Sequence, residues 1–342
     1  MKWSLISQLD NALLHLPMFV VTWGMFSLAA TTHFFLQAYL GNRRLSLGDL
    51  REAYFPFKSW IKPSAKIDII IFVVAKLIYL IPLGLAWTSL AAGLVMVTLT
   101  RMVPHHEVHQ ADYLAIILCG LAIFLISDFS RYVTHYLQHF VPILWEFHKV
   151  HHSATFLNPL TAEREHPLGK WFDGITNAIL TGCTAGTFAF VYKLSWLEIS
   201  LLAATVDKFG SIIVPNSLKH SHFPISYGVF EFVLISPRMH HVHHSARLEH
   251  WDRNFGNRLS IWDICFGTRY IPRPTETIAL GLGTAEEAEH ENFWGVYVSP
   301  FVKIGSLLTN HRRRYRAGDT RLTTGLLWRE KPNETFAGGT RL

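Results

Sequence analysis

Long apolar runs separated by short polar loops make up most of the chain up to about residue 215. Two of the runs are long enough to cross a bilayer, and three shorter ones approach the length of one crossing. The runs lie at 13–40, 69–100, 111–126, 175–192 and 197–214, the last two forming a short hairpin. Lys76 is the only charged residue in the two long runs. We therefore expect an all-α fold built on a multi-span transmembrane helical bundle.

The second run and the loops beside it set the expected topology. Pro82 and Gly84 interrupt the run 69–100, which is typical of a tilted helix with an interfacial piece or of a tight hairpin. The loop 41–68 carries six Lys and Arg residues, so we place it on the cytoplasmic side. We expect the run 69–100 to cross once, which puts the histidine clusters described below on that same side.

The third run continues beyond the length of a membrane span as a polar helix. Asp128, Tyr132, His135 and His139 follow a spacing of four, three and four residues, which keeps them on one helical face. A helix over 111–139 would be roughly 43 Å long and would end above the hydrocarbon core. We therefore expect a cytoplasmic helical cap on top of the bundle.

Composition narrows the class of protein. Only 16% of residues are charged, against about 25% in soluble domains, which favours a membrane protein. The net charge of +6 comes mostly from loops beside apolar runs, and no basic stripe typical of a nucleic-acid-binding module is present. The cysteines Cys119, Cys183 and Cys265 lie far apart and form no CxxC pair, which argues against a disulfide framework or a zinc knuckle.

Histidine is the abundant residue, with 20 copies. One HxxxH pair and two HxxHH triples stand out: His135 and His139, then His148, His151 and His152, then His240, His243 and His244. Histidines three or four apart share a helical face, and neutral imidazole binds iron, zinc, copper or nickel. These eight are too many for one ion with open positions and favour a di-metal site. A further HxxxH pair, His105 and His109, is interpreted as a loop feature.

The order and spacing of the motifs resemble the fatty acid hydroxylase/sterol desaturase superfamily over about residues 112–270. The matching segments are 127–139, 145–153, 158–168, 220–224, 236–244, 252–256 and 262–268. The resemblance implies a four-helix membrane base under a cytoplasmic cap that holds two Fe ions. It also implies an oxidoreductase that uses O2 and two electrons to hydroxylate, desaturate or cleave a lipid.

The resemblance also extends the set of site residues. It makes His220 a ninth ligand candidate and His222 a weaker substitute, and it places Asn216 where the family sometimes has another histidine. Arg164 and His166 are expected near the ligands, near a lipid headgroup, or in a packing role. Two further candidates for supporting the ligands are Asn254, in the segment 252–256, and Asp128, which either orients an imidazole or pairs with Arg131.

The expected partners are a lipid from the bilayer and a separate electron donor, either a ferredoxin or a cytochrome b5-like protein with its reductase. The basic residues Lys149, Lys170 and Arg247 either dock an acidic donor or form a solvated surface. A zinc protease is disfavoured, because His106-Glu-Val-His109 lacks the HExxH spacing. The remaining alternative is a metal transporter or a non-catalytic metal-binding membrane protein.

Three regions are expected. Membrane anchor helices and the basic cytoplasmic loop occupy 1–110, the hydroxylase-like catalytic domain occupies 111–272, and a polar C-terminal tail occupies 273–342. The expected location is a bacterial inner membrane or, alternatively, the endoplasmic reticulum. The motifs are equally compatible with sterol and fatty-acyl substrates, with hydroxylation and desaturation, and with iron and zinc ligation.

Overall fold

A computed structural model describes residues 46–316 except 55, 79–82, 193, 274 and 284, together with isolated positions between 24 and 39. Within these residues the chain is helical, with short 3-10 turns and isolated β-bridges but no strand. The expected all-α class is therefore confirmed for the described part. The expected first span, 13–40, lies mostly outside it.

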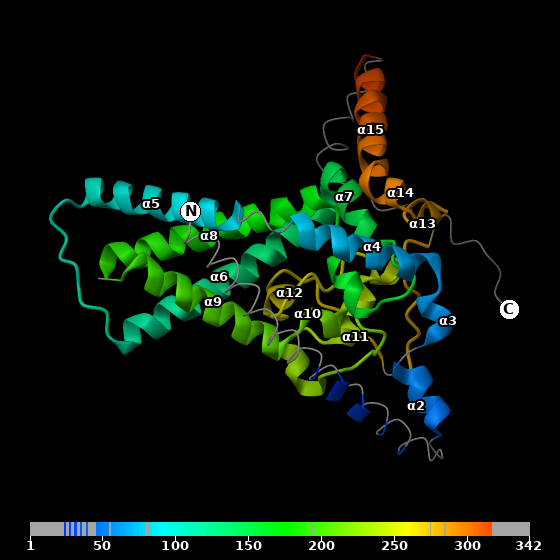
Figure 1. The fold of residues 1–342 in the computed structure, drawn as a ribbon. Helices are drawn as coiled ribbons and strands as arrows, with labels where there is room; N and C mark the ends of the chain where they lie inside the picture. The colour runs from blue at the N-terminus through cyan, green and yellow to red at the C-terminus, as the bar shows by residue number, and fades with distance from the viewer. Residues whose placement is uncertain are drawn as a thin grey trace.

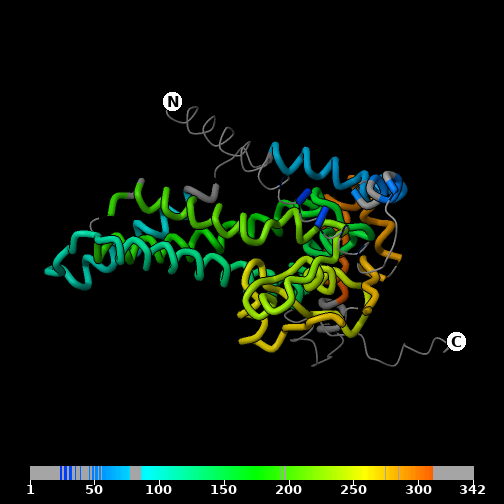
Figure 2. Tube along the Cα trace, turned by 90° about the horizontal axis from the view of Figure 1, so that it is seen from below, coloured from blue at the N-terminus to red at the C-terminus, as the bar shows by residue number. Residues whose placement is uncertain are grey.

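Four long helices lie side by side as an elongated bundle (Figures 1 and 2). They are α5 (Leu83–Met102), α6 (Tyr113–Phe140), α8 (Pro167–Val191) and α9 (Trp196–Ile213), and we call them the bundle. Helix α8 packs along α5 and α6, and α9 packs along α6. Within the described residues, α6 and α8 are long and apolar enough to cross a membrane, and they indicate a membrane protein.

Capping side chains and a proline define several ends of these helices. Asp112 caps α6 by accepting a 2.8 Å hydrogen bond from the amide of Ala115. Ser195 and Glu198 form a capping box at the start of α9. Helix α6 ends just before Pro142, which has no amide proton to continue it and instead begins α7 (Pro142–His152). The predicted continuation of the third run to His139 is confirmed.

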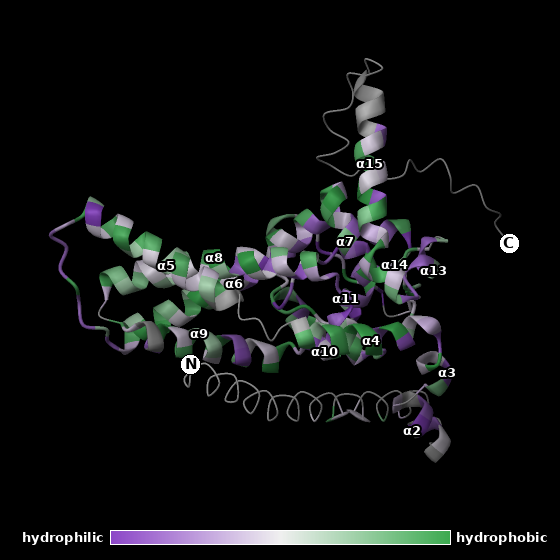
Figure 3. Cartoon of the chain, turned by 45° about the horizontal axis from the view of Figure 1, so that its top comes forward, coloured by the Kyte–Doolittle hydropathy of each residue, from purple (hydrophilic) through white to green (hydrophobic). Residues whose placement is uncertain are grey.

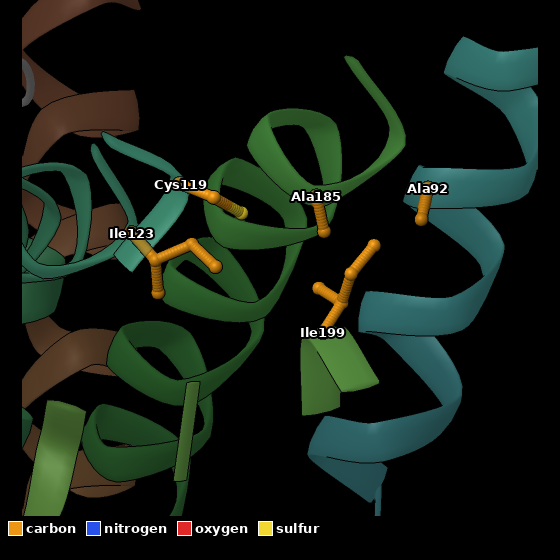
Figure 4. Close-up of a cluster of buried hydrophobic side chains, with 5 residues drawn as sticks. All are labelled: Ala92, Cys119, Ile123, Ala185 and Ile199. Carbon is orange, nitrogen blue, oxygen red and sulfur yellow. The ribbon is translucent and has the colours of Figure 1, made fainter. Parts of the chain in front are cut away.

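Small residues let α5 and α8 approach closely. A Cβ atom placed on Gly186 would lie 2.5 Å from the carbonyl oxygen of Ala92, and one on Gly182 would lie 2.5 Å from that of Thr88. The apolar core beside them is formed by Ala92, Cys119, Ile123, Ala185 and Ile199 (Figure 4). Close packing of small side chains is a common way for membrane helices to associate.

The remaining elements gather at one end of the bundle, and we call them the histidine cap (Figure 1). Its helices are α2 (Leu47–Tyr54), α3 (Phe57–Trp60), α4 (Pro63–Ile78), α7, α10 (Asn216–Lys219), α11 (Pro237–His243), α12 (Ile261–Cys265), α13 (Glu286–Glu289) and α14 (Phe293–Tyr297). Its 3-10 turns are η1 (Pro159–Glu163), η2 (Gly228–Phe232) and η3 (Leu248–His250). From it projects α15 (Ser299–Arg316). Hydrophilic residues concentrate in the cap and hydrophobic ones along the bundle (Figure 3).

Two sequence expectations take a different form in the structure. The run 69–100 falls into two helices, since α4 packs against η1 in the cap while α5 packs along α8 in the bundle. The described part of the expected polar tail, 273–316, forms α13, α14 and α15. The carbonyl oxygen of His290 in this segment accepts a 3.1 Å hydrogen bond from Arg164, so the segment belongs to the cap.

Candidate metal centre

Nine buried or half-buried histidines converge in the cap and divide into two groups. Within each group the nitrogen atoms that could bind an ion all lie within 4.8 Å of one another. The first group is His135, His139, His148, His152 and His243, and the second is His151, His220, His240 and His244. The nine residues are the same nine that the sequence selected as ligand candidates. No motif in the sequence predicts their division into groups of five and four.

Four short stretches of helix deliver these side chains. Helix α6 carries two of them near its polar C-terminal end, and α7 carries the first HxxHH triple. His220 follows directly after α10. The second triple lies on α11 and at His244, the residue that follows this helix. The HxxHH triple on α7 contributes to both groups, since His148 and His152 join the first group and His151 joins the second. Helix α7 therefore links the two groups.

The facing nitrogen atoms are close together. In the first group, Nε2 of His152 lies 3.0 Å from Nε2 of His139 and 3.2 Å from Nε2 of His148. In the second, Nε2 of His220 lies 3.1 Å from Nε2 of His151 and 2.9 Å from Nε2 of His240. Such convergence of like nitrogen atoms is typical of ligands arranged around an ion.

Backbone carbonyl oxygens hold the other ring nitrogens. Nδ1 of His135 donates to the carbonyl of Phe255 at 2.9 Å, and Nδ1 of His243 donates to that of Arg253 at 2.8 Å. Nδ1 of His151 donates to the carbonyl of Arg164 at 3.1 Å, and Nδ1 of His220 to that of Asn216 at 2.9 Å. A proton fixed on Nδ1 leaves the Nε2 lone pair free to face the centre of each group.

Burial keeps the imidazoles neutral, as metal binding requires. It lowers the pKa of His151 to about 3 and the pKa of His152, His220 and His243 well below the usual range. Nε2 of His135 and of His243 are buried and have no hydrogen-bond partner among the described residues. Unpaired buried nitrogen atoms are costly unless they bind something, so the donor set fits two metal ions.

Asp128 supports the site indirectly. Its carboxylate accepts hydrogen bonds from the amides of Arg258 and Leu259 at 3.0 and 3.1 Å, and from Nε1 of Trp262 at 3.0 Å. The expected bond from this carboxylate to a ligand imidazole, and the alternative pairing with Arg131, are both absent from the contacts of the described residues. Asp128 instead ties the segment after Phe255 to α6.

Arg164 and His166 take the packing role. The guanidinium of Arg164 is fully buried, pairs with Asp68 at 3.0 Å and also bonds Ser153 Oγ at 2.9 Å, so it does not meet a lipid headgroup. Its carbonyl oxygen orients His151. His166 caps α8 by accepting a 3.2 Å hydrogen bond from the amide of Leu168.

The other three supporting candidates differ in their contacts. Asn216 reaches the site through its carbonyl oxygen, which orients His220. His222 stacks on Phe156 with ring centroids 5.9 Å apart and belongs to neither nitrogen group. Asn254 donates 2.9 and 2.8 Å hydrogen bonds to two carbonyl oxygens, those of Met239 and Tyr270, and so ties its loop to α11.

The segment 252–256 has a larger role than the sequence indicated. Asp252 and Asn254 adopt positive φ angles of 57° and 56°, a conformation that Asp and Asn tolerate better than most residues. The resulting loop points two carbonyl oxygens at histidines of the first group. Asp263 fixes the loop by accepting from the amides of Phe255 and Gly256, and burial raises the pKa of Asp263 to about 6.

Lys219 is a site residue that sequence reasoning missed. It is buried beside His220, and its Nζ donates to the carbonyl oxygen of Asn257 at 2.5 Å. Burial lowers the pKa of Lys219 to about 7. Its position next to a ligand candidate was visible in the sequence, but its burial was not.

The basic residues considered for docking a donor are already paired. Lys149 contacts Glu146 and Glu286, each at 2.9 Å. Lys170 contacts Glu163, and Arg247 contacts Glu249. These pairs neutralise the patch and weaken the case for a basic docking surface.

The extra HxxxH pair lies far from the nine histidines, at the turn between α5 and α6. His109 forms an isolated bridge with Tyr192, and neither it nor His105 belongs to a nitrogen group among the described residues. The interpretation of this pair as a loop feature is consistent with that position.

Separate cavities open onto the two sides of the histidines. One of about 140 Å³ touches His139, His152 and His243 and is bordered by Trp145 and Trp251. Another of about 190 Å³ touches five other histidines of the site: His135, His148, His151, His220 and His240. The second lies toward the bundle, since α6 and α8 supply part of its wall. Ligands therefore have room to reach the nitrogen atoms from the bundle side.

Comparison with known proteins identifies the region that contains the site. Residues 120–268 match the family model described as fatty acid hydroxylase. Ornithine lipid hydroxylase OlsE of Rhizobium tropici is 29% identical over 154 residues, 45% of this chain and 42% of that protein. Alkylglycerol monooxygenase of Homo sapiens is 30% identical over 173 residues, 46% of this chain and 32% of that protein. The chain thus covers less than half the length of these relatives. No solved structure gives a significant match.

Proposed function

We propose that this chain, which belongs to the fatty acid hydroxylase family through residues 120–268, is a membrane-bound di-iron oxidoreductase that hydroxylates a lipid or desaturates it. The observation that carries the proposal is the pair of nitrogen groups, five imidazoles and four, buried and neutral in the cap. In hydroxylation, a C–H bond, O2, two electrons and two protons give C–OH and water. Desaturation uses the same O2 and electrons and releases two waters.

Two Fe ions held by the two groups would supply the power to oxidise an unactivated C–H bond. The protein's own residues keep the site ready for this chemistry. The carbonyls of Phe255, Arg253, Arg164 and Asn216 hold four imidazoles in one tautomer. Burial keeps water and protons away from the ligand nitrogens, and the cavity beside α6 and α8 leads the substrate to them.

The proposal includes a membrane topology. The bundle crosses the bilayer several times, with α5 as the single crossing of the run 69–100, and the cap faces the cytoplasm. The basic loop 41–68 supports this orientation. A bacterial inner membrane, or alternatively the endoplasmic reticulum, is the proposed location.

A separate electron donor completes the proposed system. The sequence carries no CxxC pair for an iron–sulfur cluster and no haem or flavin segment that we recognise. We therefore propose a ferredoxin or a cytochrome b5-like protein with its reductase. The open cavity at Trp145 and Trp251 reaches the first histidine group without passing through the bundle.

The test compares cells that express the chain with cells that express His151→Ala, in a host that supplies a working donor. Mass spectrometry of the lipid extract should show a lipid heavier by about 16 mass units, or lighter by about 2, only with the intact site. His105→Ala is the matched control, because His105 is an exposed histidine outside both groups.

Metal analysis of the same purified proteins separates the alternatives. About two Fe per chain in the wild type and in His105→Ala, and a lower content in His151→Ala, are expected. Full lipid oxidation by His151→Ala would contradict the proposal. Exchangeable ions without any change in the lipids would favour the metal transporter or the non-catalytic metal protein instead.

A further inference from the structure

A polar cavity lies inside the bundle, next to the histidine site. It measures about 240 Å³ and is bordered by α5, α6, α8 and α9. Its polar wall includes Ser127, Arg131, Asn177, Asp207 and Arg258.

Three polar atoms in this wall have no partner. Nε of Arg131, Oδ1 of Asn177 and Nη1 of Arg258 are buried and form no hydrogen bond within the described part of the chain. Buried donors and acceptors of folded proteins are almost always paired. Three unpaired atoms on residues that line one cavity therefore indicate a ligand that offers both acceptor and donor atoms.

The internal ion pairs do not satisfy these atoms. Asp207 Oδ1 lies 2.7 Å from Nη2 of Arg258 and 3.8 Å from Nη2 of Arg131. Ser211 Oγ accepts a further 2.9 Å bond from Nη2 of Arg258. Asp207 thus holds the two guanidiniums in place by one nitrogen each, and the unpaired atoms remain available. The side chain of Arg258 is only 6% exposed, whereas the side chains of Arg131 and Asp207 are 34% and 51% exposed.

The polar cavity adjoins both the histidine cavity and an apolar cavity. Arg131 also lines the cavity that touches His135 and His148. On the other side, Phe124, Val206 and Arg258 are shared with a nearly wholly apolar cavity of about 340 Å³ between α6 and α9. The polar cavity thus shares lining residues both with an apolar cavity and with the cavity that contains the candidate metal ligands.

We infer that the polar cavity binds the headgroup of an amphiphilic lipid, whose chain occupies the apolar cavity. The headgroup carries oxygen acceptors for the two arginines and an O–H or N–H donor for Asn177. Since Arg131 lines both the polar cavity and the cavity that touches His135, the headgroup lies beside the ligands, and the oxidised carbon lies in the headgroup or within a few bonds of it. Arg131 precedes His135 by four residues on α6, a rise of roughly 6 Å, which leaves room for only a few bonds. This inference rests on the proposed function for the oxidation, but the binding does not.

The binding test uses the purified full chain in detergent, exposed to the total polar lipid extract of the host. Retained lipids are measured by mass spectrometry for the wild type, Asn177→Leu, Arg131→Gln and Thr184→Val. Thr184 is the matched control, because it is a polar residue on the same helix as Asn177, is half-buried like Asn177, does not line the polar cavity and bonds its own turn at Leu180. Iron content and helical circular dichroism report whether each variant is folded.

The wild type and Thr184→Val should retain a lipid with a polar headgroup, and Asn177→Leu and Arg131→Gln should each retain about tenfold less, as loss of a buried hydrogen bond predicts. Iron content should stay the same in all four. Equal retention by folded Asn177→Leu and Arg131→Gln would overturn the inference, as would a wild type that retains no such lipid.

Two further readouts separate this inference from the proposed function. His151→Ala should retain the lipid like the wild type, because it removes only a ligand candidate. Headgroup-dependent retention without any oxidation would contradict the proposed function and leave the binding site standing. Fragmentation of an oxidised product should place the new oxygen or double bond near the headgroup, and a change in the distal half of an acyl chain would overturn the inference.

Discussion

In the core of the bundle around Cys119 and Ala185 the buried side chains are small and apolar, and the helix backbones come close together (Figure 4), whereas in the histidine cap many buried side chains are imidazoles and carboxylates, with one fully buried guanidinium. The bundle is thus stabilised by close packing, since two glycines let the backbones of α5 and α8 approach each other. The cap is held by directed hydrogen bonds, many of them to backbone carbonyl oxygens. In a polar interior, removal of one hydrogen-bond partner leaves the other buried and unsatisfied, which lowers the free energy of unfolding.

The largest effect on stability is expected at the buried ion pair of the cap. Asp68→Ala leaves the guanidinium of Arg164 unpaired in a site with no solvent exposure. We expect the free energy of unfolding to fall by about 3–5 kcal/mol. Chemical denaturation in detergent measures this. Because the carbonyl of Arg164 also orients His151, iron content should fall as well.

A surface pair provides the control for this change. Lys76 contacts Glu163 at 2.9 Å, but its side chain is 53% exposed. Lys76→Gln should change the free energy of unfolding by less than about 1 kcal/mol. If the two variants were equally stable, the cap would not depend on its buried polar network.

The bundle should respond most to a larger side chain at its closest contact. Gly186→Val places a Cβ atom 2.5 Å from the carbonyl oxygen of Ala92, so α5 and α8 must separate. We expect a loss of about 1–3 kcal/mol in the free energy of unfolding. Gly174→Ala on the same helix meets nothing within 4 Å and should be neutral or stabilising by up to about 1 kcal/mol.

Lowering the pH should destabilise the histidine cap through its buried histidines. Burial lowers the pKa of His290 to about 4 from 6.5, so between these values the unfolded chain binds a proton that the folded cap does not. The free energy of unfolding of the metal-free protein should therefore fall as the pH drops from about 6.5 to about 4, by about 1.4 kcal/mol per pH unit for each such histidine. Tryptophan fluorescence at varied denaturant and pH measures the slope.

His290→Gln tests the assignment of that slope. Removing one buried histidine should lower the slope by about one proton. An unchanged slope would mean that His290 is already protonated in the folded cap.

The smallest effect is expected at the end of the bundle farthest from the cap. Ser195→Ala removes the capping hydrogen bond to the amide of Glu198. A loss of about 1 kcal/mol in the free energy of unfolding is expected, with no change in iron content. Loss of iron in this variant would show that the two interiors are coupled along the bundle.

Sequence periodicity predicted the long helices and the convergence of eight histidines, because both depend on local spacing, whereas His220 was selected only through the resemblance to the family. The spacing on α6 and the two HxxHH triples carry that information directly. The division into two groups depends on how α7 lies against α11, which no local pattern reports. The partner of Arg164 was missed in the same way, since Asp68 lies 96 residues away.

The contacts that orient the imidazoles could not be read from side-chain types. Phe255 and Arg253 act through their carbonyl oxygens, which every residue has. The sequence offered only the Asp252 to Gly256 motif as a signal of an unusual loop. Likewise, α13 to α14 looked like a polar tail because their attachment runs through the carbonyl of His290.

Helix α6 fixes the spacing between the three cavities that it lines. It runs unbroken over Tyr113–Phe140 and carries Phe124 at the apolar cavity, Arg131 at the polar one and His135 at the ligands. Their spacing is fixed at about 1.5 Å per residue, so the distance between the compartments cannot be adjusted by backbone motion. If a lipid binds as proposed, a lipid of another length would have to be accommodated by a change in the size of individual side chains such as Phe124. Inserting a single residue into this helix would rotate every residue beyond it by about 100°.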